Sequence, residues 1–363
     1  MKLDITYFGL VEWLGLAFGV YILSALRINK RVLYNNGVRD HTEIGAWLAV
    51  LILLLLASMR SGIGDTEAYI RYYQMVSADS EVFFSTFTRT GEWGFQLLMF
   101  FCKKIFGGNI SVYLLFFAIF SVGCICVFLI RYSGMTEMAL FLYLASGLFI
   151  TNLNGMRQSF VTGIFVAATG LIIKKKYIIF IILCLALSTI HSSALILIPA
   201  VWIFNFKPWG KGTKALLFVG LILYAFYPLF APVLSSLMTS NDQYSVYSTG
   251  IMGGKGDLGA NFVRAIIKFV PIGLAYFERE KLKMKEHFSI FLHASILDFV
   301  FMLLATAKSW IFARICIYLA PFSIVLLCWG IGVANKKNRL VLYFGCLVGY
   351  SVFYIYELLS SVL

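Results

Sequence analysis

Long apolar stretches alternate with short polar interruptions along the whole sequence. A transmembrane helix needs about 20 mostly apolar residues, and such stretches recur from Tyr7 onward. The interruptions are too short for a soluble domain, so the pattern predicts an all-α, polytopic fold in which residues 1–363 form a single membrane domain. We expect about twelve spans, within a range of roughly ten to fourteen, near residues 8–26, 43–59, 111–130, 138–153, 158–173, 177–190, 192–206, 215–236, 263–278, 288–307, 310–333 and 340–359.

Two apolar stretches do not fit a simple crossing. Residues 177–206 carry lysines at both ends and the polar sequence STIHSS in the middle, which predicts two short spans or a re-entrant pair that meet near His191. Non-helical backbone at membrane depth is tolerated only where protein or water surrounds it, so we expect His191 to line a cavity. Residues 94–107 contain Lys103 and Lys104 among apolar residues, which predicts an amphipathic helix on or dipping into the outer surface.

Basic residues lie mainly between the predicted spans and set their orientation. Cytoplasmic loops of membrane proteins carry an excess of Lys and Arg, so we place the basic clusters on the cytoplasmic side. Both ends of the chain then face outward, and loops 60–94 and 238–262 are extracytoplasmic. The clusters are 27–39, 131, 174–176, 207–214, 279–285 and 336–339.

The composition agrees with a membrane protein and excludes other classes. Hydrophobic residues make up 61% of the chain, whereas a soluble domain normally has roughly 45–50%. The formal net charge of +13 would suggest a nucleic-acid partner in a soluble protein, but here the basic residues follow the orientation of the spans, so we expect no nucleic-acid partner. The seven cysteines lie almost all inside apolar stretches, and neither a disulfide framework nor a metal site is indicated.

The polar sequence SMRSGIGDTEAYIRYY at 59–74 directly follows a predicted span. Arg60 could extend toward the membrane surface, and Asp65 could cap a short helix whose first turn holds Glu67. Alternatively, both side chains belong to an outward-facing site. Both interpretations stay open, and the second has the support that every unusual polar stretch of the chain falls on the same predicted side of the membrane.

Arg157 follows a break in the apolar pattern at Asn154 and Gly155. It falls in the first turn of the next helix, where free N–H groups attract phosphate and an arginine adds bidentate recognition. Asn152 and Gln158 beside it favour a binding niche over a contact with lipid headgroups, which is the alternative.

His191 is either a buried histidine bonded to Ser188 or Ser192, or a general base at the predicted kink. Among the other histidines, His293 lies in an apolar span without a nearby partner. None of the histidines completes a metal-ligand spacing.

Two later helices each place basic residues along one face. Arg264 and Lys268 are four residues apart, as are Arg314 and Tyr318, and this spacing puts each pair on one side of a helix. An arginine inside the hydrocarbon needs an anionic partner. That partner is either Asp298, which would neutralise Arg264 or Arg314, or a diphosphate held by several arginines together.

The loop 239–262 is too rich in glycine to span the membrane and carries Tyr244 and Tyr247. Loops of this composition often bind or gate a substrate. Plain flexibility is the alternative for this loop.

Several short motifs occur in a fixed order along the chain. They are RSGIGDTEAY at 60–69, EWGF at 92–95, RQ at 157–158, HSSA at 191–194, and Arg314 with Tyr318. Together they resemble the Wzy/EpsG family of bacterial polysaccharide polymerases. The resemblance covers residues 40 to 320, and the sequence departs from the family pattern in having EWG where EPG is frequent.

The resemblance implies a glycosyltransferase, and we expect it to need no metal or cofactor, because a diphosphate is already a good leaving group and arginines supply positive charge. Such an enzyme joins oligosaccharide repeat units carried on undecaprenyl diphosphate into O-antigen, capsular or exopolysaccharide, at the outer face of the bacterial cytoplasmic membrane. A chain-length regulator protein is a further expected partner, besides membrane lipids. We expect diphosphate binding by Arg157, Arg264, Arg314 and, more weakly, Arg60; a general base among His191, Asp65 and Glu92; and sugar contacts from Gln158, Tyr69, Tyr244, Tyr247, Tyr318 and Lys268.

Three other functions use related chemistry or a similar topology. A ligase would transfer finished glycan to a lipid or protein acceptor, and a transporter or flippase would move lipid-linked sugars without reaction. A membrane acyltransferase would place its histidine against a donor on the inner side. Polar residues concentrated on the outer side favour an outward-facing enzyme over alternating access.

Overall fold

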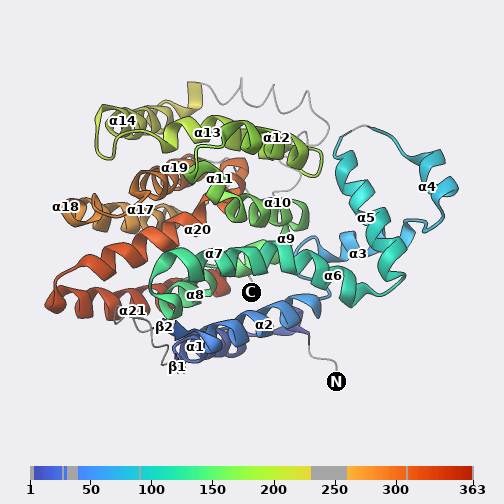
Figure 1. The fold of residues 1–363 in the computed structure, drawn as a ribbon, viewed down its shortest axis with the longest axis horizontal. Coiled ribbons are helices and arrows are strands. Elements are labelled where there is room, and N and C mark those ends of the chain that lie inside the picture. The colour runs from blue at the N-terminus through green and yellow to red at the C-terminus, as the bar shows by residue number, and fades with distance from the viewer. Residues whose placement is uncertain are drawn as a thin grey trace. The chain divides into compact units, whose positions relative to one another are not determined.

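The computed structural model describes residues 4–26, 28–30, 40–89, 91–229, 260–307 and 310–361, and these form helices almost throughout (Figure 1). The exception is a short antiparallel pair of strands, β1 (Ile28–Lys30) and β2 (Asp40–Thr42), in which Asn29 faces His41. The predicted all-α fold is therefore confirmed for the described residues apart from this pair. The chain divides into two compact units, Met1–Ala194 with Ala334–Leu363, and Leu195–Val333. The prediction of a single membrane domain stays a prediction.

The first unit, called unit 1 below, contains helices from both ends of the chain. Helix α1 packs against α2, α8 and α21, and the hydroxyls of Tyr21 and Tyr343 lie 2.9 Å apart where α1 meets α21. Its helices are η1 (Ile5–Tyr7), α1 (Leu10–Ser24), α2 (Ile44–Ser58), α3 (Thr66–Met75), α4 (Ser80–Thr86), α5 (Trp93–Phe106), α6 (Ile110–Ala118), η2 (Ile119–Gly123), α7 (Cys124–Ser133), α8 (Thr136–Ala145), α9 (Leu148–Asn154), α10 (Met156–Ala167), α11 (Thr169–Ile173), α12 (Tyr177–Ser188) and α21 (Lys336–Ser361), and η3 (Ser192–Ile196) begins at its end.

The second unit, unit 2, is organised around α19, which packs against α13, α14, α17 and α20. His293 on α19 is buried and bonded at both ring nitrogens, to the Thr213 hydroxyl at 2.8 Å and to the Ser289 carbonyl at 2.7 Å. The expectation that His293 has no partner is thus wrong, because Thr213 reaches it from α14. The helices of unit 2 are α13 (Leu197–Phe204), α14 (Lys211–Ala225), α17 (Phe262–Phe277), α18 (Arg279–Leu282), α19 (Phe288–Thr306) and α20 (Trp310–Val333).

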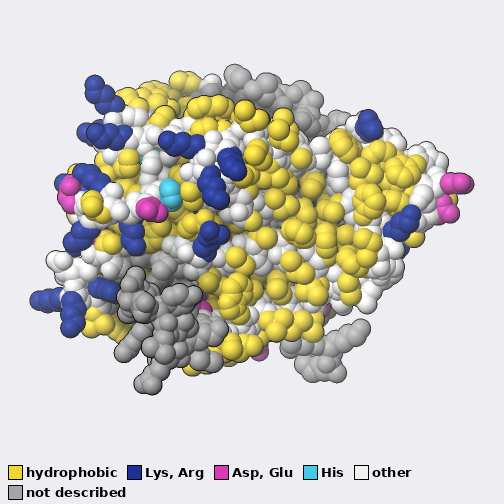
Figure 2. Space-filling model, viewed as in Figure 1, with side chains coloured by type: hydrophobic (Ala, Val, Ile, Leu, Met, Phe, Trp, Pro, Cys, Tyr) yellow, Lys and Arg dark blue, Asp and Glu magenta, His cyan; other side chains and the backbone are white. Residues whose placement is uncertain are grey.

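The helices bear out a multi-pass membrane protein. Five described helices are long and apolar enough to cross a membrane, or six if the bent pair 136–145 and 148–154 is counted as one span. Four shorter apolar helices accompany them. Eleven of the twelve predicted spans coincide with a helix or a helix pair, and the span predicted at 215–236 overlaps α14 but extends beyond the described residues. Hydrophobic side chains also cover much of the face shown in Figure 2, as expected where lipid is the solvent. The count of about twelve crossings and their orientation stay predictions.

One close contact between helices fixes the packing inside unit 1. Helices α6 and α7 form a continuous segment, Ile110–Ser133, interrupted by the π-helical turn η2. Gly163 of α10 lies so close to this turn that a Cβ atom would overlap the Phe120 carbonyl. Helices in a membrane approach this closely only where a small residue forms the interface, so Gly163 allows α10 to dock on η2.

Replacing Gly163 by alanine should destabilise the protein by about 1–3 kcal/mol, because the obstructing atoms belong to the backbone and cannot rotate away. Gly170→Ala is the matched control, since a Cβ there meets nothing within 4 Å. The unfolding midpoint of both variants in detergent, followed by tryptophan fluorescence, checks this. Equal midpoints would contradict the tight contact.

Candidate functional site

An arginine and a histidine from separate segments of unit 1 meet at one buried carboxylate. Glu92 is 6% exposed, and its Oε2 accepts a hydrogen bond from Nη1 of Arg157. Its Oε1 lies 2.6 Å from Nδ1 of His191 and accepts the backbone N–H of Ser192 at 3.0 Å. Both carboxylate oxygens are therefore engaged, and Glu92 joins the RQ and HSSA motifs.

Glu92 is held in place by the way helix α5 begins. Glu92 occupies the N-cap position of α5, and two residues later the N–H of Gly94 donates to the Thr189 carbonyl at 2.8 Å. A Cβ atom on Gly94 would overlap Thr189. The glycine of the EWG sequence therefore lets the start of α5 lie directly against the chain segment that carries His191.

His191 lies in a break between two helices, as predicted. Helix α12 ends at Ser188 and η3 begins at Ser192, so His191 belongs to neither. The expected alternative partners were Ser188 and Ser192, but Nδ1 bonds to Glu92. Ser188 donates to the Leu185 carbonyl instead. The sequence could not indicate this partner, because Glu92 is 99 residues away along the chain.

Arg157 is the second residue of α10, which begins after Gly155 and confirms the predicted helix start. Its Nε donates to the Tyr69 hydroxyl at 3.2 Å, and its guanidinium carbon lies 5.7 Å from the centre of the Phe95 ring. The Arg157 side chain is 33% exposed, whereas that of Glu92 is 3% exposed. Arg157 is therefore the member of the cluster that a ligand can reach most easily.

Tyr69, which accepts the hydrogen bond from Arg157, is itself held in place by packing. It is 7% exposed and packs edge to face on Phe95, with the ring centres 5.6 Å apart. Both rings belong to an apolar cluster that also holds Tyr113 and Phe117. This apolar cluster joins α3, α5, α6 and α10, so the packing of these helices fixes the positions of Tyr69 and Arg157.

Charge and burial act against each other at Glu92. Burial favours the neutral carboxyl, but the hydrogen bond and charge of His191, the charge of Arg157 and the Ser192 N–H together hold the pKa of Glu92 below its usual 4.5. Burial raises the pKa of Tyr69, and Arg157 only partly offsets this. At neutral pH the cluster therefore contains an ionised Glu92 and a neutral Tyr69.

This arrangement separates the roles that the sequence left open. A carboxylate with a lowered pKa and both oxygens bonded is a poor proton acceptor. The same carboxylate orients His191 through Nδ1, which leaves Nε2 as the ring nitrogen that can take a proton. Glu92 and His191 thus form a carboxylate–histidine pair beside an arginine.

Two other candidates, Asp65 and Arg60, bond to residues outside this pair, although Asp65 is close enough for its charge to act on Arg157 and Tyr69. Asp65 is exposed at the N-cap of α3, but its carboxylate makes no capping hydrogen bond, and its N–H donates to Asn154 at 3.0 Å. Arg60 is 4% exposed and donates to the Ala57 carbonyl at 2.5 Å and the Thr66 hydroxyl at 3.2 Å. Burial lowers the pKa of Arg60 to about 10, so it stays charged at neutral pH. Its inward position suits a structural role better than extension to the membrane surface.

The remaining candidates are buried, belong to unit 2 or lie outside the described residues. Gln158 is buried within α10. In unit 2, Lys268 donates to Oδ2 of the fully buried Asp298 at 2.9 Å, and Ser323 donates to the same oxygen at 2.7 Å. The anion expected to neutralise Arg264 or Arg314 thus binds Lys268, which is one turn further along α17 than Arg264.

Arg264 and Arg314 are half-buried and Tyr318 is fully buried. Since all three belong to unit 2, their participation in a site with Arg157 stays a prediction. Tyr244 and Tyr247 lie outside the described residues. Among the described residues, no group of three or more His, Cys, Asp or Glu side chains could hold a metal ion.

Comparison with known families agrees with the motifs that form the cluster. The EpsG family model matches residues 46–362. The chain belongs to the EpsG family. Membership implies a membrane protein with a role in polysaccharide biosynthesis. Neither the curated proteins nor the solved structures contain a match to this chain.

The sequence indicated each member of the cluster but missed the bond between Arg157 and Glu92. A usable signal was present, because a partly buried arginine needs an anion and Glu92 lies on the same predicted side as Arg157. Glu92 was instead considered only as one of three possible bases. Its position between the arginine and the histidine depends on tertiary contacts.

The lowered pKa of Glu92 predicts acid sensitivity. A carboxylate whose pKa is lower in the folded than in the unfolded protein stabilises the fold when the pH is above the unfolded-state pKa, here 4.5. This stabilisation is lost as the pH falls through the folded-state pKa. Glu92→Gln should therefore flatten the loss of stability as the pH falls below about 4.5, and cost about 1–3 kcal/mol at neutral pH. Unfolding midpoints across this range check it, with the exposed Glu67→Gln as control. Parallel curves for wild type and Glu92→Gln would contradict the bonded carboxylate.

Proposed function

We propose that this EpsG-family protein is a polymerase that joins oligosaccharide repeat units carried on a lipid diphosphate, at the outer face of the bacterial cytoplasmic membrane. The observation that supports it most is the cluster of Glu92, His191 and Arg157. It combines a histidine oriented by a carboxylate with an arginine at a helix start. Glycosyl transfer from a diphosphate needs a base for the acceptor and a positive charge for the leaving group.

Arg157 is the proposed contact to the diphosphate. It lies in the first turn of α10, where unpaired N–H groups and the helix dipole favour an anion. Its charge is partly offset by Glu92, so a diphosphate would compete with Glu92 for the guanidinium. Arg264 and Arg314 of unit 2 are further proposed contacts to a diphosphate.

His191 is the proposed general base, and Glu92 the residue that positions it. A hydroxyl on the non-reducing end of one lipid-linked unit gives its proton to Nε2 of His191. The oxygen attacks the anomeric carbon of a second unit, and the bond from that carbon to the diphosphate oxygen breaks. The lipid diphosphate leaves with the electron pair and is stabilised by Arg157, and His191 then releases its proton to solvent.

The polymer made by the host tests the function. Deletion of the gene should leave surface glycan as single repeat units attached to their acceptor, because units are still made and exported but not joined. Gel analysis of the glycan measures this. Long chains that are not attached to an acceptor would identify a ligase instead, and loss of all surface glycan would favour a transporter. An unchanged ladder would exclude all three.

The residue roles are tested in the deleted strain by complementation. Arg157→Ala and His191→Ala should each reduce polymer by about 10²–10⁴-fold with normal protein levels, because a general base or an oxyanion contact contributes that much to the rate. Arg157→Lys should restore little, since an ammonium cannot replace a bidentate guanidinium. Arg279→Ala, an exposed arginine of unit 2, is the control. Full polymer in the Arg157→Ala strain would return Arg157 to a contact with lipid headgroups.

A further inference from the structure

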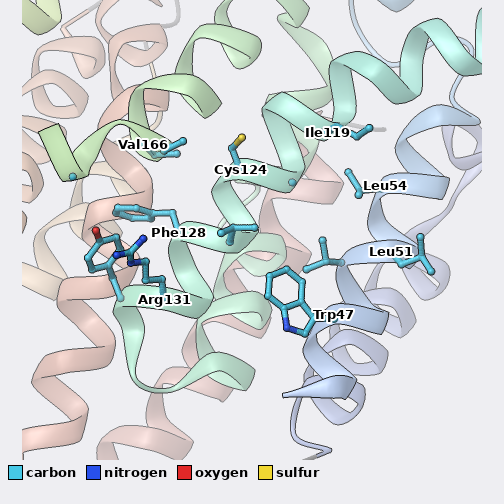
Figure 3. A pocket seen from close by; sticks show the side chains of 14 residues that line it. Trp47, Leu51, Leu54, Ile119, Cys124, Phe128, Arg131 and Val166 are labelled. Carbon is cyan, nitrogen blue, oxygen red and sulfur yellow. The ribbon is translucent and has the colours of Figure 1, made fainter. Parts of the chain in front are cut away.

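An apolar groove in unit 1 lies away from the Glu92 cluster. It has a volume of about 470 Å³, which lies in the range of small-molecule sites. Its walls come from α2, from the continuous segment Ile110–Ser133 and from α10 with α11, and are almost entirely apolar. Figure 3 shows Arg131 and Trp47 toward its lower part and Ile119, Cys124 and Val166 toward its upper part.

The groove matches the dimensions of one membrane leaflet. Ile119 and Arg131 are twelve residues apart on one helical segment, which corresponds to about 18 Å along its axis. Half of the hydrocarbon core is about 15 Å thick. Trp47 is 48% exposed and Ile119 is 45% exposed, so the groove is open to the lipid on its side. A single acyl chain lying along the helices would fill it.

The charged end of the groove has the character of a membrane interface. Arg131 lies 5.5 Å from the centre of the Tyr132 ring, and aromatic residues with Arg are typical of the headgroup level. None of the groove-lining residues is acidic. The lysines 174–176 begin about one turn after the lining residue Gly170, and the N–H of Lys174 donates to the Gly170 carbonyl. Glu43 precedes the lining residue Trp47 by four positions in the sequence. Its carboxylate accepts a hydrogen bond from the Thr136 hydroxyl at 2.8 Å.

We propose that this groove binds one glycerophospholipid with an anionic headgroup, its acyl chain between α2 and α7 and its phosphate at Arg131. The ligand is not the glycan-bearing lipid of the proposed reaction. Gly163 of α10 contacts Phe120, and the groove-lining residues of α10, α11 and α7 all follow this contact along the chain. Arg157 instead precedes Gly163 by six residues, so Arg131 and the Glu92 cluster lie on opposite sides of this contact. The bound lipid therefore comes from the other leaflet, and its binding does not depend on the proposed polymerase activity.

Trp47 gives a direct measurement of occupancy, because bromine atoms on an acyl chain quench tryptophan fluorescence on contact. The protein in phosphatidylcholine nanodiscs is titrated with brominated phosphatidylglycerol or brominated phosphatidylcholine, and subtraction of Trp47→Phe isolates the signal of Trp47. The anionic lipid should reach half-maximal quenching at about fivefold lower mole fraction, the effect of one arginine contact at the membrane surface. Equal quenching by the two lipids would overturn the proposal.

Two variants separate a specific site from general attraction to a basic surface. Arg131→Gln should abolish the preference for phosphatidylglycerol, whereas Arg279→Gln should keep it, because Arg279 lies in unit 2. Val127→Phe fills the groove beside Cys124 from a position that is 43% exposed, so it should reduce quenching while Arg131 remains. If Arg131→Gln does not fold, Val127→Phe decides. Unchanged quenching in Val127→Phe, or a preserved preference in folded Arg131→Gln, would overturn the proposal.

Discussion

The candidate site of unit 1 depends on one buried carboxylate. Glu92 is 3% exposed along its side chain and binds Arg157 from one segment of the chain and, from another, His191 together with the backbone N–H of Ser192. A buried charge is tolerated only when it is paired and hydrogen-bonded. The start of α5, the start of α10 and the break before η3 must therefore come together for Glu92 to remain ionised. The same constraint that orders these segments also orients His191 and holds Arg157.

A second buried carboxylate organises unit 2 in a similar way. Asp298 is 0% exposed and is bonded by Lys268 of α17 and Ser323 of α20. Ionisable groups within membrane spans are costly and usually pair with one another. The difference between the two sites is access, because the cation at Glu92 is 33% exposed and the cation at Asp298 is 19% exposed. The pair of Asp298 and Lys268 thus resembles a structural ion pair, whereas Glu92 holds an arginine that a ligand can reach.

Sequence reasoning predicted the helices well because lipid imposes a simple rule. Each apolar stretch long enough to satisfy its own backbone hydrogen bonds must be helical, and so the break at His191 and the helix start before Arg157 could be read from polar interruptions. Partner choice follows no such local rule. The sequence offered Asp298 as one of two possible anionic partners for Arg264 or Arg314, yet Asp298 binds Lys268, which lies one turn further along the same face of α17 than Arg264. Likewise the bond between Glu92 and Arg157 spans 65 residues and depends on the close approach of Gly94 to Thr189.

The charges of the Glu92 cluster match the charges that the proposed reaction develops. With His191 neutral, the ionised Glu92 and Arg157 offset each other, so the cluster carries no net charge before reaction. When Nε2 of His191 takes the proton of the acceptor hydroxyl, the cluster becomes positive by one unit. That change comes as the bond to the diphosphate breaks and negative charge accumulates on the leaving oxygen. Because Glu92 is bonded to both His191 and Arg157, its negative charge is shared between the imidazolium and the guanidinium. Its orientation needs no change during the step. Proton transfer and departure of the diphosphate would therefore be coupled through one carboxylate.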